Sequence, residues 1–425
     1  MRSTKESTHP GLWIPALGLI AAMWLLTMTD LPAQTEILAI RGGTVLPMVQ
    51  GAIERGVIVV EEGKISQVGR DIPIPGGATV IPGENCWILP GLIAAHSTIG
   101  LREEGRPAAL DELSSPNAAA LMIIDGVNPF DKSIEHARRA GITTALVASG
   151  RGNVIGGQPA VVKTRGRTVT EMTLLSPAGV KFSLGEGPKD AFGDKGRLPS
   201  TRMGSAFVVR NALIEAGEYR RKWREYESKE AKDEVTPPKR DLMLEPLAAL
   251  LDGRLTAFFE CYRVDDIMTA LRLIDEFKLK ALLVGCAEGF RIPEEIARRG
   301  IPVIVGPMGI GPKRMETQEV KIENAAILAK AGIKVVIQSD DALGLGSLEE
   351  LPLAAALAVK GGLDRSAALR AITLTAAEVL GVADRVGSLE PGKDADMVVF
   401  DGDPLDYRTR VIRVLIDGKT VYEKN

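Results

Sequence analysis

Residues 88–100 constrain the fold of this chain more than any other stretch. They read Ile-Leu-Pro-Gly-Leu-Ile-Ala-Ala-His-Ser-Thr-Ile-Gly, a short apolar run that ends in a single histidine among polar residues. An unbroken apolar run of this length is typical of a strand that is buried on both faces. In a βα barrel such strands carry polar residues at their carboxyl ends, where the chemistry takes place. The run therefore predicts a barrel strand that ends at His96.

The size of the chain allows one barrel and one smaller domain. The chain has 425 residues, of which 45% are hydrophobic, and a βα barrel takes about 250 residues. Its 52 Lys and Arg residues against 55 Asp and Glu give a formal net charge of -3. This balance offers no basic face for nucleic acid, so we expect a small-molecule substrate and no nucleic-acid partner.

The middle of the chain alternates short apolar runs with helical periodicity. Eight runs suit barrel strands, and eight is the number that a closed βα barrel needs. They lie at 89–96, 143–148, 158–163, 179–184, 256–260, 281–285, 302–306 and 334–338. The fold class is therefore predicted to be α/β, a (β/α)8 TIM-like barrel over residues 89–384. A charged helical insertion interrupts it near residues 206–245.

Both ends of the mature chain carry β signals. Residues 36–88 and 385–425 each contain β-branched runs separated by glycine-containing turns. Neither part has enough strands to bury a core alone. We therefore expect one small composite β-sandwich domain that is built from both ends.

Residues 1–35 form a targeting segment by their pattern. Arg2 and Lys5 precede an apolar run at residues 11–28, and Ala33 offers a small residue at a cleavage point. A cleaved signal peptide and an uncleaved membrane anchor both fit this pattern. In either case we expect an exported protein, in a bacterial periplasm or anchored facing it, that contacts the membrane only through this segment.

Two motifs resemble those of the amidohydrolase superfamily, and of its imidazolonepropionase-like exported branch in particular. The first is Pro-Gly-Leu-Ile-x-x-His at residues 90–96, and the second is Gly-x-Leu-x-Pro-Gly-Lys-x-Ala-Asp at residues 387–396. In that branch the first motif normally ends His-x-His, and both histidines bind a catalytic metal. This chain has Thr98 at the second position. Only His9, His96 and His136 are present, whereas a binuclear zinc site of the usual family kind takes four histidines.

The resemblance implies a reduced set of metal ligands. On the family pattern Glu260 falls where strand five supplies a histidine, and Asp340 falls on the catalytic aspartate that follows strand eight. The strand-six histidine falls on Gly285, with Cys286 beside it. The candidate ligands are therefore His96, Glu260, Asp340 and Cys286, all of which are chemically sensible for zinc or another divalent metal. If the site is degenerate instead, no metal is expected.

Two functions remain open at this point. One is hydrolysis of a carbon-nitrogen bond in a cyclic amide or dipeptide-like substrate, in which Asp340 moves the proton. The other is a catalytically inactive protein of the same fold, which binds a ligand or serves as the partner subunit of an intact hydrolase. A homo-oligomer is equally compatible with the sequence.

Several other side chains belong to these predictions. Arg202 could bind a substrate carboxylate or form a buried salt bridge, and Thr98 could contact substrate. Cys261 and Cys286 follow adjacent strands, so a disulfide, a soft metal pocket and two unrelated thiols all remain open. The insertion carries Tyr219, Trp223 and Tyr226 on one helical face, which could cover the mouth of the barrel.

Overall fold

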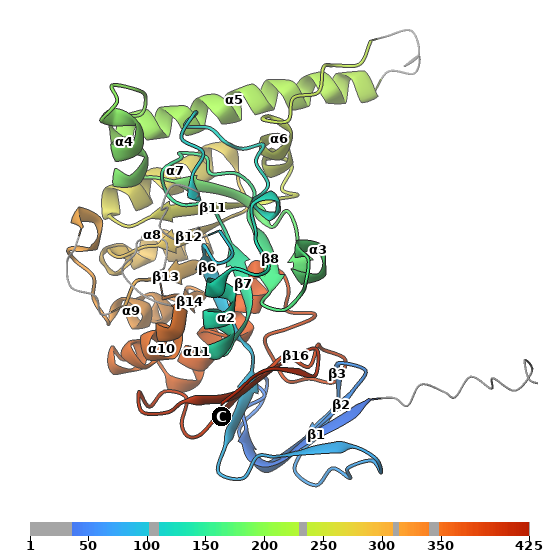
Figure 1. Ribbon diagram of the computed structural model, residues 1–425. Helices are drawn as coiled ribbons and strands as arrows, with labels where there is room; N and C mark the ends of the chain where they lie inside the picture. The colour runs from blue at the N-terminus through green and yellow to red at the C-terminus, as the bar shows by residue number, and fades with distance from the viewer. Residues whose placement is uncertain (1–35, 102–109, 229–235, 309–313, 340–347, 425) are drawn as a thin grey trace, which may run out of the picture. The chain divides into compact units, whose positions relative to one another are not determined.

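The two ends of the chain meet in one eight-stranded sheet (Figure 1). The computed structural model describes residues 36–101, 110–228, 236–308, 314–339 and 348–424. The strands of the sheet are β1 (Ile37–Val45), β2 (Ile53–Glu61), β3 (Lys64–Gly69), β4 (Thr79–Pro82), β5 (Trp87–Pro90), β15 (Met397–Phe400), β16 (Val411–Ile416) and β17 (Lys419–Glu423). Their order is β17-β16-β15-β5-β1-β2-β3, with β4 paired to β1. The antiparallel pairing of β5 with β15 joins the two ends, as expected for a composite domain, although all the strands belong to a single sheet.

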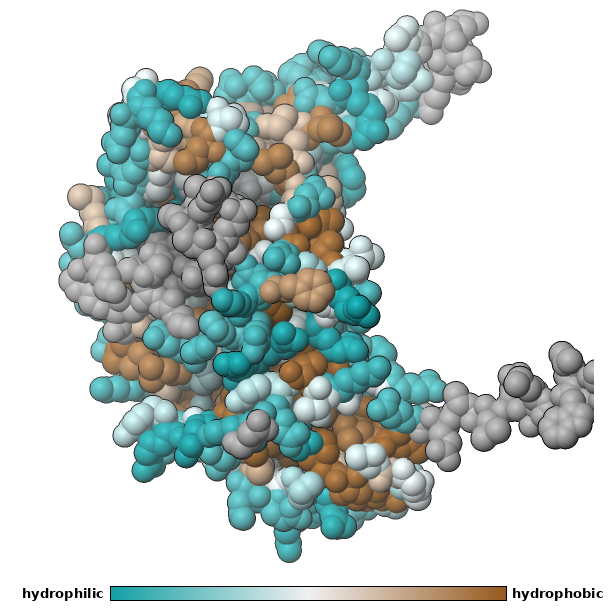
Figure 2. All heavy atoms as spheres, in the orientation of Figure 1, coloured by the Kyte–Doolittle hydropathy of each residue, from teal (hydrophilic) through white to brown (hydrophobic). Residues whose placement is uncertain are grey.

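Local sequence explains this sheet. The turns Glu62-Gly63 and Asp417-Gly418 have positive φ at both residues, which is the backbone of the tight hairpin turns that match strand twist. Ile40, Ile58, Ile88 and Met397 are fully buried and pack together as its core. Hydrophobic residues are also visible at the surface over this sheet in Figure 2.

Within the described residues, the barrel has seven strands that run in one direction and one that runs in the other. The parallel strands are β6 (Leu92–Ser97), β7 (Ile142–Val147), β10 (Gly179–Ser183), β11 (Thr256–Cys261), β12 (Ala281–Gly285), β13 (Val303–Val305) and β14 (Val335–Ile337). β8 (Ala160–Lys163) pairs antiparallel with β7, and β9 (Thr173–Leu175) pairs antiparallel with β8. Residues 154–159 continue the line of β8 beside β10, where the Lys181 amide donates to the Gly157 carbonyl at 2.9 Å.

The prediction of a regular βα barrel is therefore wrong at its third strand. The run at 158–163 is a strand, but it returns beside β7 in the opposite direction. Residues 148–159, which connect the two strands, contain no helix. A parallel neighbour needs a crossover connection, usually a helix, so the chain here can only fold back antiparallel.

The interior of the barrel is filled by side chains from nearly every strand. Ile93, Leu146, Val161, Phe258, Leu282, Val284, Ile304 and Val336 pack in one buried cluster with Ala376, Ala377 and Leu380 of α12. The barrel is thus a packed core, closed at one end by a helix, and its chemistry is confined to the other end.

Helices cover the outside of the barrel. They are α2 (Lys132–Arg139), α3 (Val169–Met172), α4 (Glu186–Gly193), α5 (Arg202–Glu227), α6 (Glu245–Leu251), α7 (Val264–Phe277), α8 (Pro293–Ala297), α9 (Asn324–Lys330), α10 (Leu351–Lys360), α11 (Arg365–Ala371) and α12 (Leu374–Leu380), with short 3-10 turns at Ile123–Asp125, Gly289–Arg291, Met315–Thr317 and Leu348–Glu350. The predicted charged insertion is α5, which begins after Thr201, whose side chain accepts from the Gly204 amide. α5 packs on α6 and α7 and lies far from the sheet in Figure 1.

The predicted targeting segment, residues 1–35, lies outside the described residues. Within the part of the chain that the structure describes, no helix combines the length and apolar character needed to cross a membrane.

A buried lysine fastens the barrel to the sheet. Lys163, the last residue of β8, places its Nζ 2.8 Å from Asp394, 3.0 Å from Asp396 and 2.5 Å from Asp417. All three aspartates come from the C-terminal end of the chain, and Asp394 also contacts Lys64 and Arg385. Burial raises the pKa of Asp396 to about 6, although the charge of Lys163 acts against this rise. The contact therefore depends on one ammonium that offsets several carboxylates.

Replacement of Lys163 by Met should destabilise the protein strongly. The change leaves the buried carboxylate of Asp396 without its cation, and breaking a buried ion pair in this way costs about 3–5 kcal/mol. Lys64→Met is the matched control, since the Lys64 side chain is 51% exposed and exposed pairs contribute about 0–1 kcal/mol. The free energy of unfolding in urea measures both. Equal losses in the two variants would contradict this account.

Candidate functional site

Polar side chains gather where the parallel strands end. Along β11 the interior position Phe258 is followed two residues later by Glu260, which faces the same side of the strand. On β10, Lys181 and Ser183 alternate with the outward apolar residues Val180 and Phe182. The strand periodicity therefore aims a lysine and a carboxylate at the same end of the barrel.

Lys181 and Glu260 form the central contact of this region. Their side chains are each 1% exposed, and Lys181 Nζ lies 2.7 Å from Glu260 Oε2. Nζ also donates to the carbonyls of Ser149 and Gly150, both at 2.7 Å. The remaining carboxylate oxygen, Oε1, accepts from the Tyr262 hydroxyl at 3.0 Å. Burial alone would raise the pKa of Glu260, but the charges of its neighbours, Lys181 first, hold it at about 2.

His96 lies beside this pair. The register between β6 and β7 is irregular from Ala94 to Ser97, which is the local kink by which a bulge re-aims a side chain. Both ring nitrogens of His96 are buried and have no hydrogen-bond partner among the residues that the structure describes. Burial, and then the charge of Lys181, lower the pKa of His96 to about 4, while Glu260 acts in the opposite direction. The imidazole is therefore neutral at pH 7 and keeps a free lone pair.

Other buried polar atoms near the strand ends also lack partners in the described ranges. They are Ser149 Oγ, Asp111 Oδ1 and both amide atoms of Gln338. Buried polar atoms are normally satisfied, so this group is suited to a small polar molecule or to water. The predicted residue Thr98 is fully buried just past the end of β6.

Sequence reasoning assigned neither Lys181 nor Asp111 to the site. Lys181 stands near the start of its apolar run, where no catalytic residue was expected, but its long side chain carries the ammonium to Glu260. The signal that could have found it is the alternation of polar and apolar residues along β10. Asp111 lies in a loop outside every predicted strand, and burial raises its pKa while Lys181 acts to lower it.

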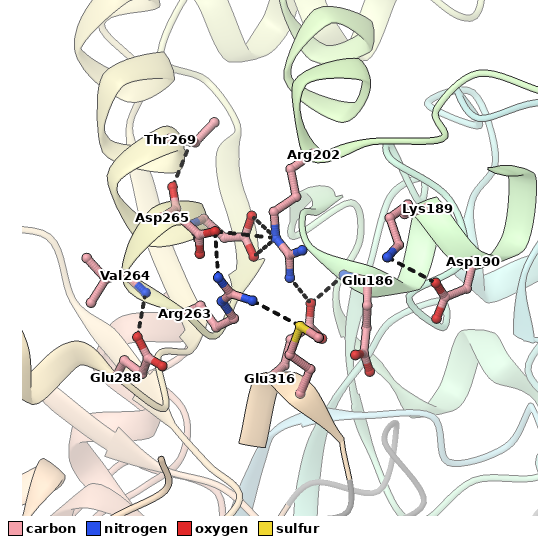
Figure 3. A network of polar contacts seen from close by, with 12 residues as sticks. Glu186, Lys189, Asp190, Arg202, Arg263, Val264, Asp265, Thr269, Glu288 and Glu316 are labelled. Atoms are coloured by element: carbon pink, nitrogen blue, oxygen red, sulfur yellow. Dashed lines mark hydrogen bonds and ion pairs between the residues drawn. The ribbon is translucent and has the colours of Figure 1, made fainter. Parts of the chain in front are cut away.

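Arg202 takes part in an ion-pair network at the start of α5 (Figure 3). Its Nε lies 3.1 and 3.0 Å from the two carboxylate oxygens of Asp266 on α7. A terminal nitrogen lies 3.5 Å from Glu316, whose pKa burial raises to about 7. Of the two alternatives that the sequence left open, the structure contains the salt bridge, and a contact of Arg202 with substrate stays a prediction.

Arg151 connects this network to the site. It lies in the loop after β7, 3.4 Å from both Glu186 and Glu316. Its charge also acts on Glu260, whose pKa it helps to lower. Arg151 therefore adds a second positive charge close to the Lys181–Glu260 pair.

The two cysteines after adjacent strands are close neighbours. Cys286 donates its backbone amide to the Cys261 carbonyl at 2.7 Å, and both residues are fully buried. Both are free thiols, and the pKa of Cys261 lies well above its usual value because of burial and the nearby Cys286 sulfur. Cys286 therefore contacts Cys261 rather than completing a set of ligands.

The described residues do not fit the divalent metal, such as zinc, that is typical of the family which the motifs resemble. Among them, no three His, Cys, Asp or Glu side chains come together in a way that could hold a metal ion. Glu260 is engaged by Lys181 and Tyr262, so His96 alone keeps a free nitrogen lone pair, whereas protein zinc sites have three or four protein ligands. Asp340, the remaining predicted ligand and proton carrier, lies outside the described residues.

Comparison with known proteins finds similarity to the same family in sequence and in structure. The sequence profile of the amidohydrolase family matches residues 269–421. The crystal structure of an amidohydrolase from Thermotoga maritima is 33% identical, with a TM-score of 0.86, and the match covers 91% of this chain and 100% of that one.

Curated relatives match over less of their own length. The amidohydrolase tasK of Hapsidospora irregularis is 26% identical over 399 residues, which is 87% of this chain but 40% of that protein. An imidazolonepropionase from Geobacillus kaustophilus is 40% identical over 82 residues, or 19% of each chain. The chain thus spans less than half the length of the curated relatives that it matches.

His96 should make the stability of the protein sensitive to mild acid. Its pKa is lowered from 6.5 to about 4 on folding, so below pH 6.5 the unfolded chain binds a proton that the folded protein resists. Stability is therefore lost as the pH falls from 6.5 towards 4. Between pH 7 and 5 the wild type should lose about 2 kcal/mol more than His96→Asn.

Urea unfolding at both pH values measures this difference. Other groups titrate in both proteins and cancel in the comparison. Parallel pH profiles for the wild type and His96→Asn would show that His96 is not buried in its neutral form.

Proposed function

Because the chain belongs to the amidohydrolase family, whose members are hydrolases that act on carbon-nitrogen bonds, we propose that it hydrolyses such a bond in a small cyclic amide or dipeptide-like substrate. The reaction would take place at the carboxyl ends of the parallel barrel strands. The observation that carries the proposal is His96, a buried neutral imidazole beside the Lys181–Glu260 pair, whose nitrogens have no partner within the described part of the chain. A buried base without a partner is suited to a proton of substrate or of the attacking water.

The chemistry is derived from the residues of this chain. His96 accepts a proton from the water that attacks the carbonyl carbon of the substrate. The charges of Lys181 and Arg151 favour the negative oxygen that develops on that carbon, since positive charge in a buried site acts strongly. The proton then passes to the leaving nitrogen as the carbon-nitrogen bond breaks, which yields a carboxylate and an amine.

The second proton transfer involves His96 and Asp340. Its low pKa makes the imidazolium a strong acid, so the proton is given up readily to an amine. Asp340, which takes the place of the catalytic aspartate by resemblance, is assigned to the same step as the group that passes the proton from His96 to the leaving nitrogen. Glu260, with a pKa of about 2, stays ionised and acts through its charge.

A second function is favoured by one specific observation. The ammonium of Lys181 is fully hydrogen-bonded and compensates the charge of the Glu260 carboxylate, which is also what a site without chemistry would need. On this alternative the protein binds a ligand, or pairs with an intact hydrolase subunit, without turnover. Export through residues 1–35 is part of both proposals and rests on the sequence pattern alone.

Substitution of His96 or Asp340 by Asn should abolish turnover. We expect a loss of at least 100-fold in kcat, the usual effect of removing a general acid or base. His136→Asn is the matched control, because His136 lies on α2, on the outside of the barrel. The assay is amine release from a panel of cyclic amides and dipeptide-like compounds, with circular dichroism to confirm folding.

The outcomes separate the two functions. Retained turnover in both His96→Asn and Asp340→Asn would exclude the proposed hydrolysis. A folded wild-type protein that is inert across the panel, and that purifies with a histidine-complete relative, would favour the second function.

A further inference from the structure

We propose that the ammonium of Lys181 occupies, on Glu260, the position that a divalent cation takes in metal-binding members of the family. The protein would then carry its own internal cation and keep the site charge-compensated without metal. This inference concerns how the site is held together. It does not depend on turnover, so it can stand or fall separately from the proposed hydrolysis.

Every donor of the Lys181 ammonium has a hydrogen-bond acceptor. Lys181 Nζ has three donors, and it has three acceptors at 2.7 Å, which are Glu260 Oε2 and the carbonyls of Ser149 and Gly150. Its side chain is 1% exposed. Two main-chain carbonyls and one carboxylate, all oxygen atoms, thus form a cage for one cation.

Both oxygens of the Glu260 carboxylate are also engaged in contacts. Glu260 Oε2 receives Lys181, with Ser183 Oγ at 3.5 Å, and Oε1 accepts from the Tyr262 hydroxyl. An ionised carboxylate has about four acceptor positions, so few remain for a metal. A divalent ion on Glu260 would also have to approach the Lys181 ammonium, and like charges at short range in a buried site repel each other strongly.

The sequence also supports the replacement of a metal cation by the Lys181 ammonium. By resemblance, Glu260 stands where the family has a neutral histidine ligand, so the substitution adds a negative charge to the barrel interior. A buried carboxylate without a partner is strongly unfavourable. Lys181, aimed inward from the adjacent strand β10, supplies the matching positive charge. We read Lys181 and Glu260 as one unit that replaced a metal and its histidine.

This unit also positions neighbouring residues. The carbonyls that Lys181 binds belong to the loop after β7, immediately before Arg151. The same ammonium helps to keep His96 neutral. Lys181 is therefore a positioning residue, which joins the ends of β10 and β11 to this loop and sets the charge that His96 experiences.

The experiment uses the full chain and three proteins: wild type, Lys181→Met and Lys181→Met/Glu260→Gln. We expect wild-type protein, purified without a histidine tag and incubated with zinc, to hold under about 0.1 equivalent by elemental mass spectrometry and to show no rise in its melting midpoint. Lys181→Met should melt lower, because Glu260 is left uncompensated. Zinc should raise the midpoint of this variant by at least ~2 °C, because the cation position is now open.

The double variant is the control, and it keeps the test informative if Lys181→Met folds poorly. Removal of both charges should restore most of the lost stability and abolish the response to zinc. One equivalent of zinc in the wild type would overturn the inference. So would equal instability of the single and double variants, or a folded Lys181→Met protein that does not respond to zinc. None of these readouts measures hydrolysis, so each of these failures would leave the proposed function untouched.

Discussion

A carboxylate inside a barrel must be matched by a positive charge, and much of this structure follows from how that is achieved for Glu260. In the β10–β11 register Ser183 is the partner of Glu260, and Lys181 lies two pairs earlier, opposite Phe258. Only a long side chain can rise from that level to the end of the barrel. The acceptors that it meets there belong to the loop after β7, so the positions of two strands and one loop are coupled through a single ammonium.

The same principle operates at the opposite end of the barrel, where Lys163 meets Asp394, Asp396 and Asp417. The reversed direction of β8 explains this placement. Because β8 runs antiparallel to β7, its last residue lies beside the start of that strand, at the end of the barrel that faces the sheet. A parallel third strand would have carried Lys163 to the site instead. Strand direction thus decides that the buried Lys163 contacts the sheet, whereas the buried Lys181 contacts the site.

These two lysines also show what the sequence can predict. The composite sheet was predictable because β-branched runs and tight turns are local signals. His96 and Glu260 could be singled out because each ends a recognisable apolar run and falls on a family motif. The direction of β8 could not be found, since an apolar run carries no information about direction. The partners of Lys181 could not be found either, because Ser149 and Gly150 contribute main-chain carbonyls, which every residue type has.

The electrostatics finally limit which residue can move a proton in this site. Glu260 is held ionised by Lys181, so with a pKa of about 2 it is too weak a base to take a proton from water. The three donors of Lys181 are all engaged, so it cannot deliver a proton without breaking the contacts that position it. His96 differs from both, because it is neutral and neither of its nitrogens is hydrogen-bonded. Among the described residues of this cluster, the one side chain that the ion pair leaves free is therefore the one suited to acid–base chemistry.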